Sequence, residues 1–212
     1  MKYKGIIFDL DGVICSTDQY HYRAWKKLAD KIGVYFDESI NERLRGVSRE
    51  DSLDIILEKS KHKYTQEVKK EFLKIKNDYY KMLLDDMSPN ELDGDVKKTL
   101  DVLKESNIKL AIGSSSKNAC FILSRLGLDD YFDAISDGTN ITKSKPDPEV
   151  FMKAADMLRL KPQDCLIVED ALAGVEAALK GNFDCAGINA AKTHPLITYQ
   201  LHIFSDLLKY IF

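Results

Sequence analysis

Two aspartates near the start of the chain have the spacing of a phosphoryl-transfer or acid–base pair. Asp9 and Asp11 lie in the run Asp-Leu-Asp-Gly, directly after a short apolar segment at 5–8. Two carboxylates this close repel each other unless they share a proton or a cation, and Mg²⁺ prefers oxygen ligands. Aspartate and glycine are also common turn residues, so the run taken alone fits a plain turn equally well.

Three later segments carry residues suited to phosphate or a cation. The run Ser114-Ser115-Ser116-Lys117-Asn118 offers hydroxyls and backbone N–H groups for a phosphate, or is an ordinary helix-capping loop. Lys145, held in a loop by Pro146, can neutralise phosphate charge or be a solvated surface lysine. Glu169 and Asp170 can complete a cation site or simply open a helix.

The segments that precede these residues have the composition of buried strands. Apolar runs at 5–8, 110–112, 166–168 and 185–188 show no polar alternation, as expected for strands covered on both faces. Amphipathic segments between them predict helices over about 95–105, 118–126, 148–158 and 173–180. This alternation predicts an α/β fold with a doubly wound parallel sheet, whose carboxyl edge gathers the polar residues. We expect a last strand at 201–204, with Ser205 capping a closing helix.

Residues 16–88 interrupt the alternation, because only helical spacing is found there. Apolar residues recur at that spacing over 24–32 and 68–82, and two shorter helices are expected between them. Ser48, with Asp51 three residues later, forms a near capping box for one of these. We therefore expect a helical domain over 16–88 inserted into a sheet domain made of 1–15 and 89–212.

Composition excludes several classes of partner. The 34 acidic and 31 basic residues give a net charge of −3, so no basic excess indicates nucleic acid or an anionic membrane. The first apolar run is too short for a signal peptide, and no segment approaches the roughly 18 apolar residues of a membrane span. We expect a cytoplasmic monomer without a membrane or nucleic-acid partner. The four cysteines form no CxxC pair and are expected to be buried reduced thiols.

The order of the four polar groups is the most specific feature of the sequence. Asp9-x-Asp11, Ser114, Lys145-Pro146 and Glu169-Asp170 follow one another at predicted strand and loop ends. This series resembles the four motifs of the haloacid dehalogenase superfamily, and the resemblance covers essentially the whole chain. It implies that Asp9 is the nucleophile that carries the phosphate and that Asp11 is the general acid and base. It also implies that the helical insert is a cap that closes over the site.

Other stretches resemble the phosphosugar mutases of that superfamily. They lie at 21–25, 45–52, 76–77, 114–118 and 144–146, with departures at Ser115, where alanine is usual, and Ala171, where serine is common. The resemblance implies an isomerase that interconverts β-D-glucose 1-phosphate and β-D-glucose 6-phosphate through β-glucose 1,6-bisphosphate. A sugar-phosphate phosphatase on the same scaffold is the alternative. A non-enzymatic sugar-phosphate sensor is disfavoured, because sensing needs no nucleophile.

The resemblance also implies a cofactor and roles for individual residues. Mg²⁺ is expected at Asp9, Asp11 through its backbone carbonyl, and Asp170, with Glu169 at or near the ion. Ser114 and Lys145 are expected on the transferring phosphoryl group, whereas Arg49, Ser116 and Asn118 hold the other phosphate. The full predicted set for sugar phosphates is Thr17, His21, Trp25, Gly46, Val47, Ser48, Arg49, Lys76, Ser114, Ser115, Ser116, Lys117, Asn118 and Lys145.

Three members of this set also have ordinary structural explanations. His21 can be a packed or surface imidazole, and Trp25, one turn later, can belong to the core alone. Lys76 flanks an apolar stripe, so it can be a surface lysine whose stem covers apolar residues. Their burial and contacts distinguish these explanations.

Overall fold

A computed structural model describes residues 2–44 and 48–212 of the chain. The chain divides into two compact units. One joins the first sixteen residues to Ser88–Phe212, and the other is Thr17–Met87. The role of the second unit as a cap stays a prediction.

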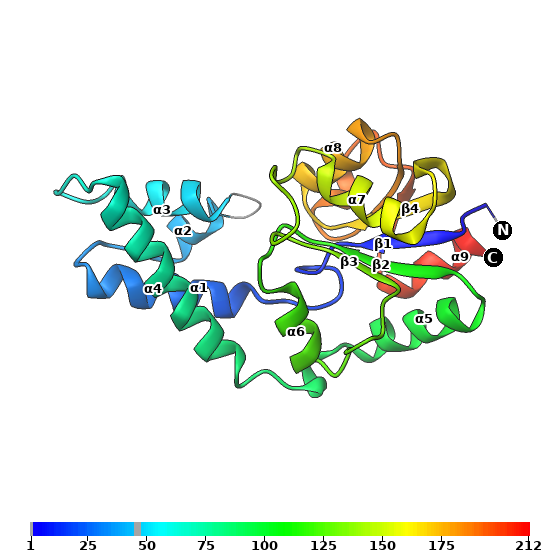
Figure 1. The fold of residues 1–212 in the computed structure, drawn as a ribbon, viewed down its shortest axis with the longest axis horizontal. Coiled ribbons are helices and arrows are strands. Elements are labelled where there is room, and N and C mark those ends of the chain that lie inside the picture. Colours follow the sequence, from blue (N-terminus) through cyan, green and yellow to red (C-terminus); the bar gives the residue numbers. More distant parts are fainter. Residues whose placement is uncertain (1, 45–47) are drawn as a thin grey trace. The chain divides into compact units, whose positions relative to one another are not determined.

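The larger unit is built on a six-stranded sheet in the order β3-β2-β1-β4-β5-β6, with all neighbouring strands parallel. The strands are β1 (Gly5–Phe8), β2 (Lys109–Gly113), β3 (Ala134–Ser136), β4 (Cys165–Glu169), β5 (Asp184–Gly187) and β6 (Tyr199–Gln200). The helices are α5 (Gly94–Glu105), α6 (Ala119–Arg125), α7 (Glu149–Leu158), α8 (Leu172–Lys180) and α9 (Leu208–Ile211). Figure 1 shows α7 and α8 on one face of the sheet and α5 and α9 on the other. The predicted α/β fold with a parallel sheet is confirmed.

The central strands are apolar because both of their faces are covered. All four residues of β1 are buried, as are the five of β4. On one face Ile7 packs in a cluster with Phe151 of α7 and Val175 of α8. On the other face the Phe8 ring stacks on Phe204, with ring centroids 5.7 Å apart. Burial on both faces removes the polar alternation that a half-exposed strand would show.

The C-terminal segment differs from its prediction. The last strand is Tyr199–Gln200, whereas the expected strand at 201–204 is largely loop, and Phe204–Leu207 forms a 3₁₀ turn. Ser205 lies inside that turn and is not its cap. Asp206 accepts hydrogen bonds from the N–H groups of His202 and Ile203, and thereby turns the chain. Of the apolar residues in this stretch, Leu201 and Phe204 are buried in the core, whereas Ile203 is exposed.

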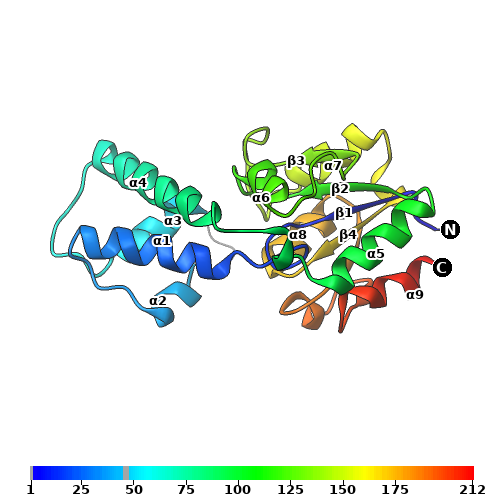
Figure 2. The ribbon, with the colours of Figure 1, turned by 90° about the horizontal axis from the view of Figure 1, so that it is seen from below.

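The smaller unit is helical, and its described residues contain no strand. Its helices are α1 (Asp18–Lys31), α2 (Glu38–Glu42), α3 (Arg49–Leu57) and α4 (Gln66–Leu84). Helices α1 and α4 form its main pair, seen side by side in Figure 2. The Ser48 hydroxyl accepts the Asp51 N–H at 3.1 Å, as expected for the cap of α3. Trp25 and Leu28 of α1 pack with Ile56 of α3 in its core.

The cysteines are all free, but only three of them are buried. Cys15, Cys165 and Cys185 lie in the core of the larger unit, whereas Cys120 is exposed. The expectation of four buried thiols is therefore wrong for Cys120, which lies on the outer side of α6. None of the described helices is long and apolar enough to cross a membrane.

Candidate active site

Asp9 directly follows β1, and the strand register places it among the other predicted site residues. Phe8 is level with Ile112 of β2 and with Val168 of β4. The next residues of the three strands are therefore Asp9, Gly113 and Glu169, all at the carboxyl edge of the sheet. The strand order also reverses direction at β1, which is where parallel α/β sheets usually bind their ligands.

The loop after Asp9 needs a glycine at position 12. Gly12 has φ +88°, and a Cβ built there would lie 2.1 Å from Oδ2 of Asp170. The Asp170 carboxylate thus lies directly against the Asp-x-Asp-Gly loop. The carbonyl of Gly12 also accepts a hydrogen bond of 2.9 Å from the side-chain amide of Asn189. Two later loops therefore hold this turn from outside.

Lys145 joins the first and the last of the four sequence groups. Its ammonium donates to Oδ1 of Asp9 and, at 2.5 Å, to Oε1 of Glu169. Its side chain is 10% exposed and that of Glu169 only 1%. A surface location for Lys145 is therefore excluded, and the lysine is the positive charge between two buried carboxylates.

This arrangement changes the protonation behaviour of both partners. Burial raises the pKa of Asp9 well above its usual range, Lys145 opposes that rise, and the neighbouring Glu169 and Asp11 add to it. Burial acts to lower the pKa of Lys145, but the charges of Asp9 and Glu169 outweigh it and raise that pKa. The lysine is therefore an ammonium throughout the neutral range, and additional positive charge beside Asp9 favours its carboxylate form.

Both carboxylate oxygens of Glu169 accept hydrogen bonds from other groups of the protein. Besides the contact with Lys145, its Oε2 accepts the backbone N–H groups of Asp170 and Ala171, each at 2.8 Å. A Cβ at Gly174 would lie 1.8 Å from Oε1, so the first turn of α8 also encloses this carboxylate. Through these contacts Glu169 holds the Lys145 ammonium in place. Its predicted position at or near a metal ion stays a prediction.

The serine loop lies at the same edge, after β2. Ser114 is buried, and its N–H donates to Ser136 of β3 at 3.0 Å. The Ser114 hydroxyl accepts the Ser116 N–H, and the Ser116 hydroxyl accepts the Asn118 N–H. The Ser115 Oγ is buried with no hydrogen-bond partner among residues 2–44 and 48–212. The fourth residue of the loop, Lys117, is exposed.

The oxygen donors of this edge suit a magnesium ion. Within the described part of the chain, no three carboxylate, imidazole or thiol side chains gather at metal-ligand spacing. Mg²⁺ is commonly held by only one or two carboxylates, with water and substrate phosphate completing its shell. Asp9 and Asp170 flank the loop of Asp11, and among the described residues Lys145 is the cation that acts on Asp9, beside the acidic Glu169 and Asp11. This donor set fits Mg²⁺.

Lys76 and His21 form a pair inside the helical unit. Lys76 is 1% exposed and donates to Nδ1 of His21 at 2.8 Å. Its ammonium also lies 4.9 Å from the ring centroid of Trp25 and 4.5 Å from that of Tyr80. A surface location for Lys76 is therefore excluded. Trp25 belongs to the core and at the same time forms one wall around this ammonium.

The pair fixes the protonation state of the imidazole. Burial, then the charges of Lys76 and Arg49, lower the pKa of His21 well below its usual range. His21 is thus neutral at neutral pH, and because its Nδ1 accepts from Lys76, its proton is on Nε2. Burial also lowers the pKa of Arg49, which still remains a guanidinium cation.

The remaining predicted residues of the helical unit have varied positions. Thr17 is 1% exposed and precedes α1, and Ser48 caps α3, which Arg49 opens. Gly46 and Val47, predicted to line the sugar pocket, lie outside the described residues.

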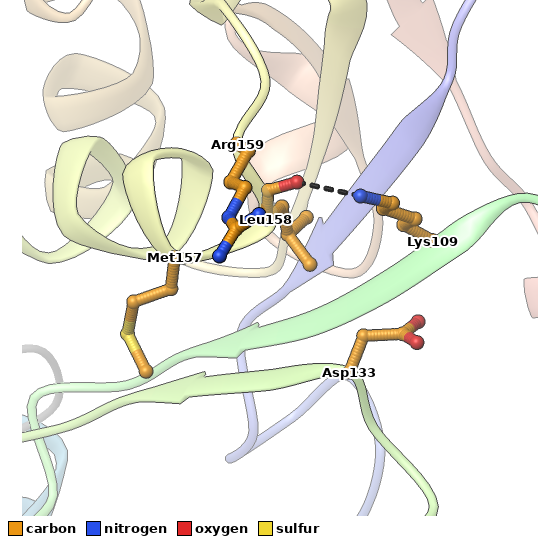
Figure 3. Close-up of a pocket in the computed structure, with 5 residues that line it drawn as sticks. All are labelled: Lys109, Asp133, Met157, Leu158 and Arg159. Carbon is orange, nitrogen blue, oxygen red and sulfur yellow. Dashed lines mark hydrogen bonds between the residues drawn. The ribbon is translucent and has the colours of Figure 1, made fainter.

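A shallow depression on the larger unit lies elsewhere. Figure 3 shows its lining, made of Lys109, Asp133, Met157, Leu158 and Arg159. Lys109 begins β2 and Asp133 precedes β3, so the depression lies at the amino edge of the sheet, opposite the acidic residues. Lys109 donates to the carbonyl of Leu158 at 2.8 Å and thereby closes the end of α7. Lys109 thus has a structural role.

Comparison with known proteins agrees with this geometry. The model of the haloacid dehalogenase-like hydrolase family matches residues 3–182. The chain belongs to this family. The resemblance seen in the sequence is thereby confirmed.

Individual relatives include a mutase and a phosphatase. The chain is 45% identical to the β-phosphoglucomutase of Bacillus subtilis over 187 residues, which are 87% of this chain and 83% of that protein. It is 32% identical to a phosphorylated carbohydrates phosphatase of Thermotoga maritima over 82% of this chain and 80% of the relative. The crystal structure of β-phosphoglucomutase from Clostridium difficile matches with a TM-score of 0.89 and 38% identity, covering 99% of this chain and 95% of that one.

Sequence reasoning missed Asn189, whose side chain holds the Gly12 carbonyl. It is one of the few non-glycine residues with positive φ, at 52°. Asparagine is enriched in that conformation, but a single asparagine after a predicted strand does not reveal its partner 177 positions earlier.

Proposed function

We propose that the protein is a β-phosphoglucomutase that interconverts β-D-glucose 1-phosphate and β-D-glucose 6-phosphate. The observation that carries this proposal is the buried Lys145 ammonium between Asp9 and Glu169 at the carboxyl edge of β1 and β4. A nucleophilic carboxylate beside a fixed cation is what phosphoryl transfer requires, because the reaction depends on alignment and charge neutralisation. The likeness to mutases over nearly the whole chain supports the sugar substrate.

Asp9 attacks the phosphorus of a sugar phosphate and becomes an aspartyl phosphate. Asp11 gives a proton to the departing sugar oxygen, and in the second half-reaction takes a proton from the attacking hydroxyl. Lys145 and Ser114 hold the oxygens of the transferring group. Mg²⁺, when held by Asp9, the Asp11 carbonyl and Asp170, supplies further positive charge and keeps Asp9 ionised.

The second phosphate of the bisphosphate intermediate needs its own binding group. Two phosphates carry about four negative charges near neutral pH, more than Lys145 and one metal ion offset. Arg49 suits a two-point grip on the distal phosphate, because a guanidinium can donate two parallel hydrogen bonds to one phosphate. We assign the helical unit the role of a cap that excludes water, because water would hydrolyse the aspartyl phosphate.

A sugar-phosphate phosphatase is the second candidate, because a phosphatase is among the relatives. The two differ in the fate of the aspartyl phosphate: a mutase returns it to sugar, and a phosphatase gives it to water. Arg49, His21 and Lys76 favour the mutase, because a bisphosphate intermediate carries a second phosphate that needs additional positive charge, whereas a phosphatase substrate carries one.

One assay separates the two. β-Glucose 1-phosphate is supplied with Mg²⁺, with and without catalytic bisphosphate, and glucose 6-phosphate and free phosphate are measured together. A mutase produces glucose 6-phosphate, needs the bisphosphate for full rate, and releases little phosphate. Steady phosphate release without isomerisation would reject the mutase and leave the phosphatase.

A further inference from the structure

Glu149, the first residue of α7, binds the loop that carries Lys145. Both of its carboxylate oxygens accept the N–H of Thr142, each at 3.0 Å. Its Oε2 also accepts the Thr142 hydroxyl at 2.9 Å and the N–H of Lys143 at 2.8 Å. One side chain thus fixes the backbone and side chain of residues that lie only two or three positions before Lys145.

The other side of the loop is tied as well. Asp147 accepts the Glu149 N–H at 3.0 Å, and its own N–H donates to Ser144 at 3.1 Å. Lys180 of α8 donates to the carbonyl of Pro146 at 3.2 Å. With the Glu149 contacts, these bonds close the segment 142–149 on both sides of Lys145.

The charge of Glu149 suits this task. Its side chain is 19% exposed and lies 2.8 Å from the ammonium of Lys153, one turn along α7. The hydrogen bond from Lys153 lowers the pKa of Glu149 most, burial opposes it, and the hydrogen bonds from Thr142 and Lys143 add to the lowering, so that the pKa is about 2. Glu149 is therefore a carboxylate at neutral pH, and both of its oxygens accept hydrogen bonds.

We propose that Glu149 is a positioning residue for phosphoryl transfer, acting through Lys145. This inference rests on the proposed role of Lys145 at Asp9. Without the Glu149 carboxylate, the N–H groups of Thr142 and Lys143 lose their acceptor, and the loop can no longer hold the ammonium against Asp9 and Glu169. An acidic residue that only stabilises the start of a helix would affect stability but not this alignment.

The test compares Glu149→Ala and Glu149→Gln with Asp156→Asn. Asp156 is an exposed carboxylate on the same helix, so its change controls for lost charge on α7. Glu149→Gln keeps the side-chain volume and provides a folded variant if the alanine variant is unstable. The assay is the rate at which acetyl phosphate, a small donor without a sugar, phosphorylates the protein in Mg²⁺.

We expect the maximal rate to fall by about 10² in Glu149→Ala and less in Glu149→Gln, because small misplacements of a catalytic group cost about that factor. The half-saturating donor concentration should change little, and Asp156→Asn should behave as wild type. A wild-type maximal rate in a folded Glu149→Ala or Glu149→Gln protein would overturn the proposal, as would an equal loss in Asp156→Asn.

A second readout needs no turnover. The ¹H–¹⁵N signal of the Lys145 ammonium is expected in wild type and in Asp156→Asn, because the group is buried and hydrogen-bonded, and should be lost in Glu149→Ala. If the wild-type protein accepts no phosphoryl group, the proposed function fails, and this signal then decides the placement of Lys145 by itself. An unchanged signal in folded Glu149→Ala contradicts the proposal.

Discussion

Replacing Gly174 by alanine should reverse the usual effect of that substitution in a helix. Gly174 lies in the first turn of α8, and an ordinary Gly→Ala change in a helix stabilises by about 1 kcal/mol. Here the new Cβ would lie 1.8 Å from Oε1 and 1.9 Å from Cδ of Glu169, whereas real Cβ contacts essentially never fall below 3.0 Å. The carboxylate must therefore retreat from the new Cβ by about 1 Å or more, and with it Oε1, the oxygen that Lys145 binds.

That retreat breaks a buried ion pair. Complete removal of one partner of a buried pair costs about 3–5 kcal/mol, so we expect a net loss of at most about 2–4 kcal/mol after the helical gain. Turnover should fall by about 10², because Lys145 loses one of the two carboxylates that hold it beside Asp9. Urea unfolding gives the first quantity, and the initial rate with β-glucose 1-phosphate gives the second.

Gly94 provides the matched control. It begins α5 with nothing within 4 Å of the position of its Cβ, so Gly94→Ala should be neutral or stabilising and fully active. If Gly174→Ala is as stable and as active as Gly94→Ala, then Glu169 does not need its place against Lys145, and the reasoning about this pair is refuted.

Three other changes test separate parts of the site. Since His21 is held neutral when folded, the unfolded chain binds an extra proton below about pH 6.5, so stability should fall on acidification by up to about 1.4 kcal/mol per pH unit. Urea unfolding across that range should show a smaller slope in His21→Gln, and equal slopes would count against a neutral His21. Arg49→Ala should raise KM for hexose phosphate by about 10-fold or more while leaving hydrolysis of a small phosphate ester nearly unchanged; equal losses would reject its role at the distal phosphate. Chelation with EDTA should abolish turnover with no change in circular dichroism, and added Mg²⁺ should restore it; full activity in EDTA would contradict the metal site.

Much of the larger unit could be predicted from the sequence, because its central strands are buried on both faces and read as uninterrupted apolar runs. The strand Ala134–Ser136 was missed because three residues are too few for a pattern. The apolar residues of 201–204 were read as a strand, whereas Leu201 and Phe204 are buried as part of a turn that Asp206 closes. Hydrophobicity reports burial and does not by itself report backbone conformation.

The site shows a similar division. Asp9 could be predicted because it follows an apolar strand, and Lys145 because it precedes a proline in a loop. Both positions therefore have a local sequence signal. The contact between Asp9 and Lys145 joins residues far apart in the sequence, so no local pattern predicts it. Only the order of the four motifs indicated that these residues would meet. Glu149 and Asn189 carry no signal at all, because their importance lies in the backbone groups that they bind.

The most direct test is the detection of phosphate on Asp9. Wild-type protein is incubated with β-glucose 1,6-bisphosphate and Mg²⁺, quenched in acid, and mapped by peptide mass spectrometry, with Asp9→Asn treated in parallel. We predict one acyl phosphate, removable by hydroxylamine, on the peptide that contains Asp9, and none in the variant. An unmodified wild-type peptide, or a phosphate on another residue that persists in Asp9→Asn, would contradict this mechanism.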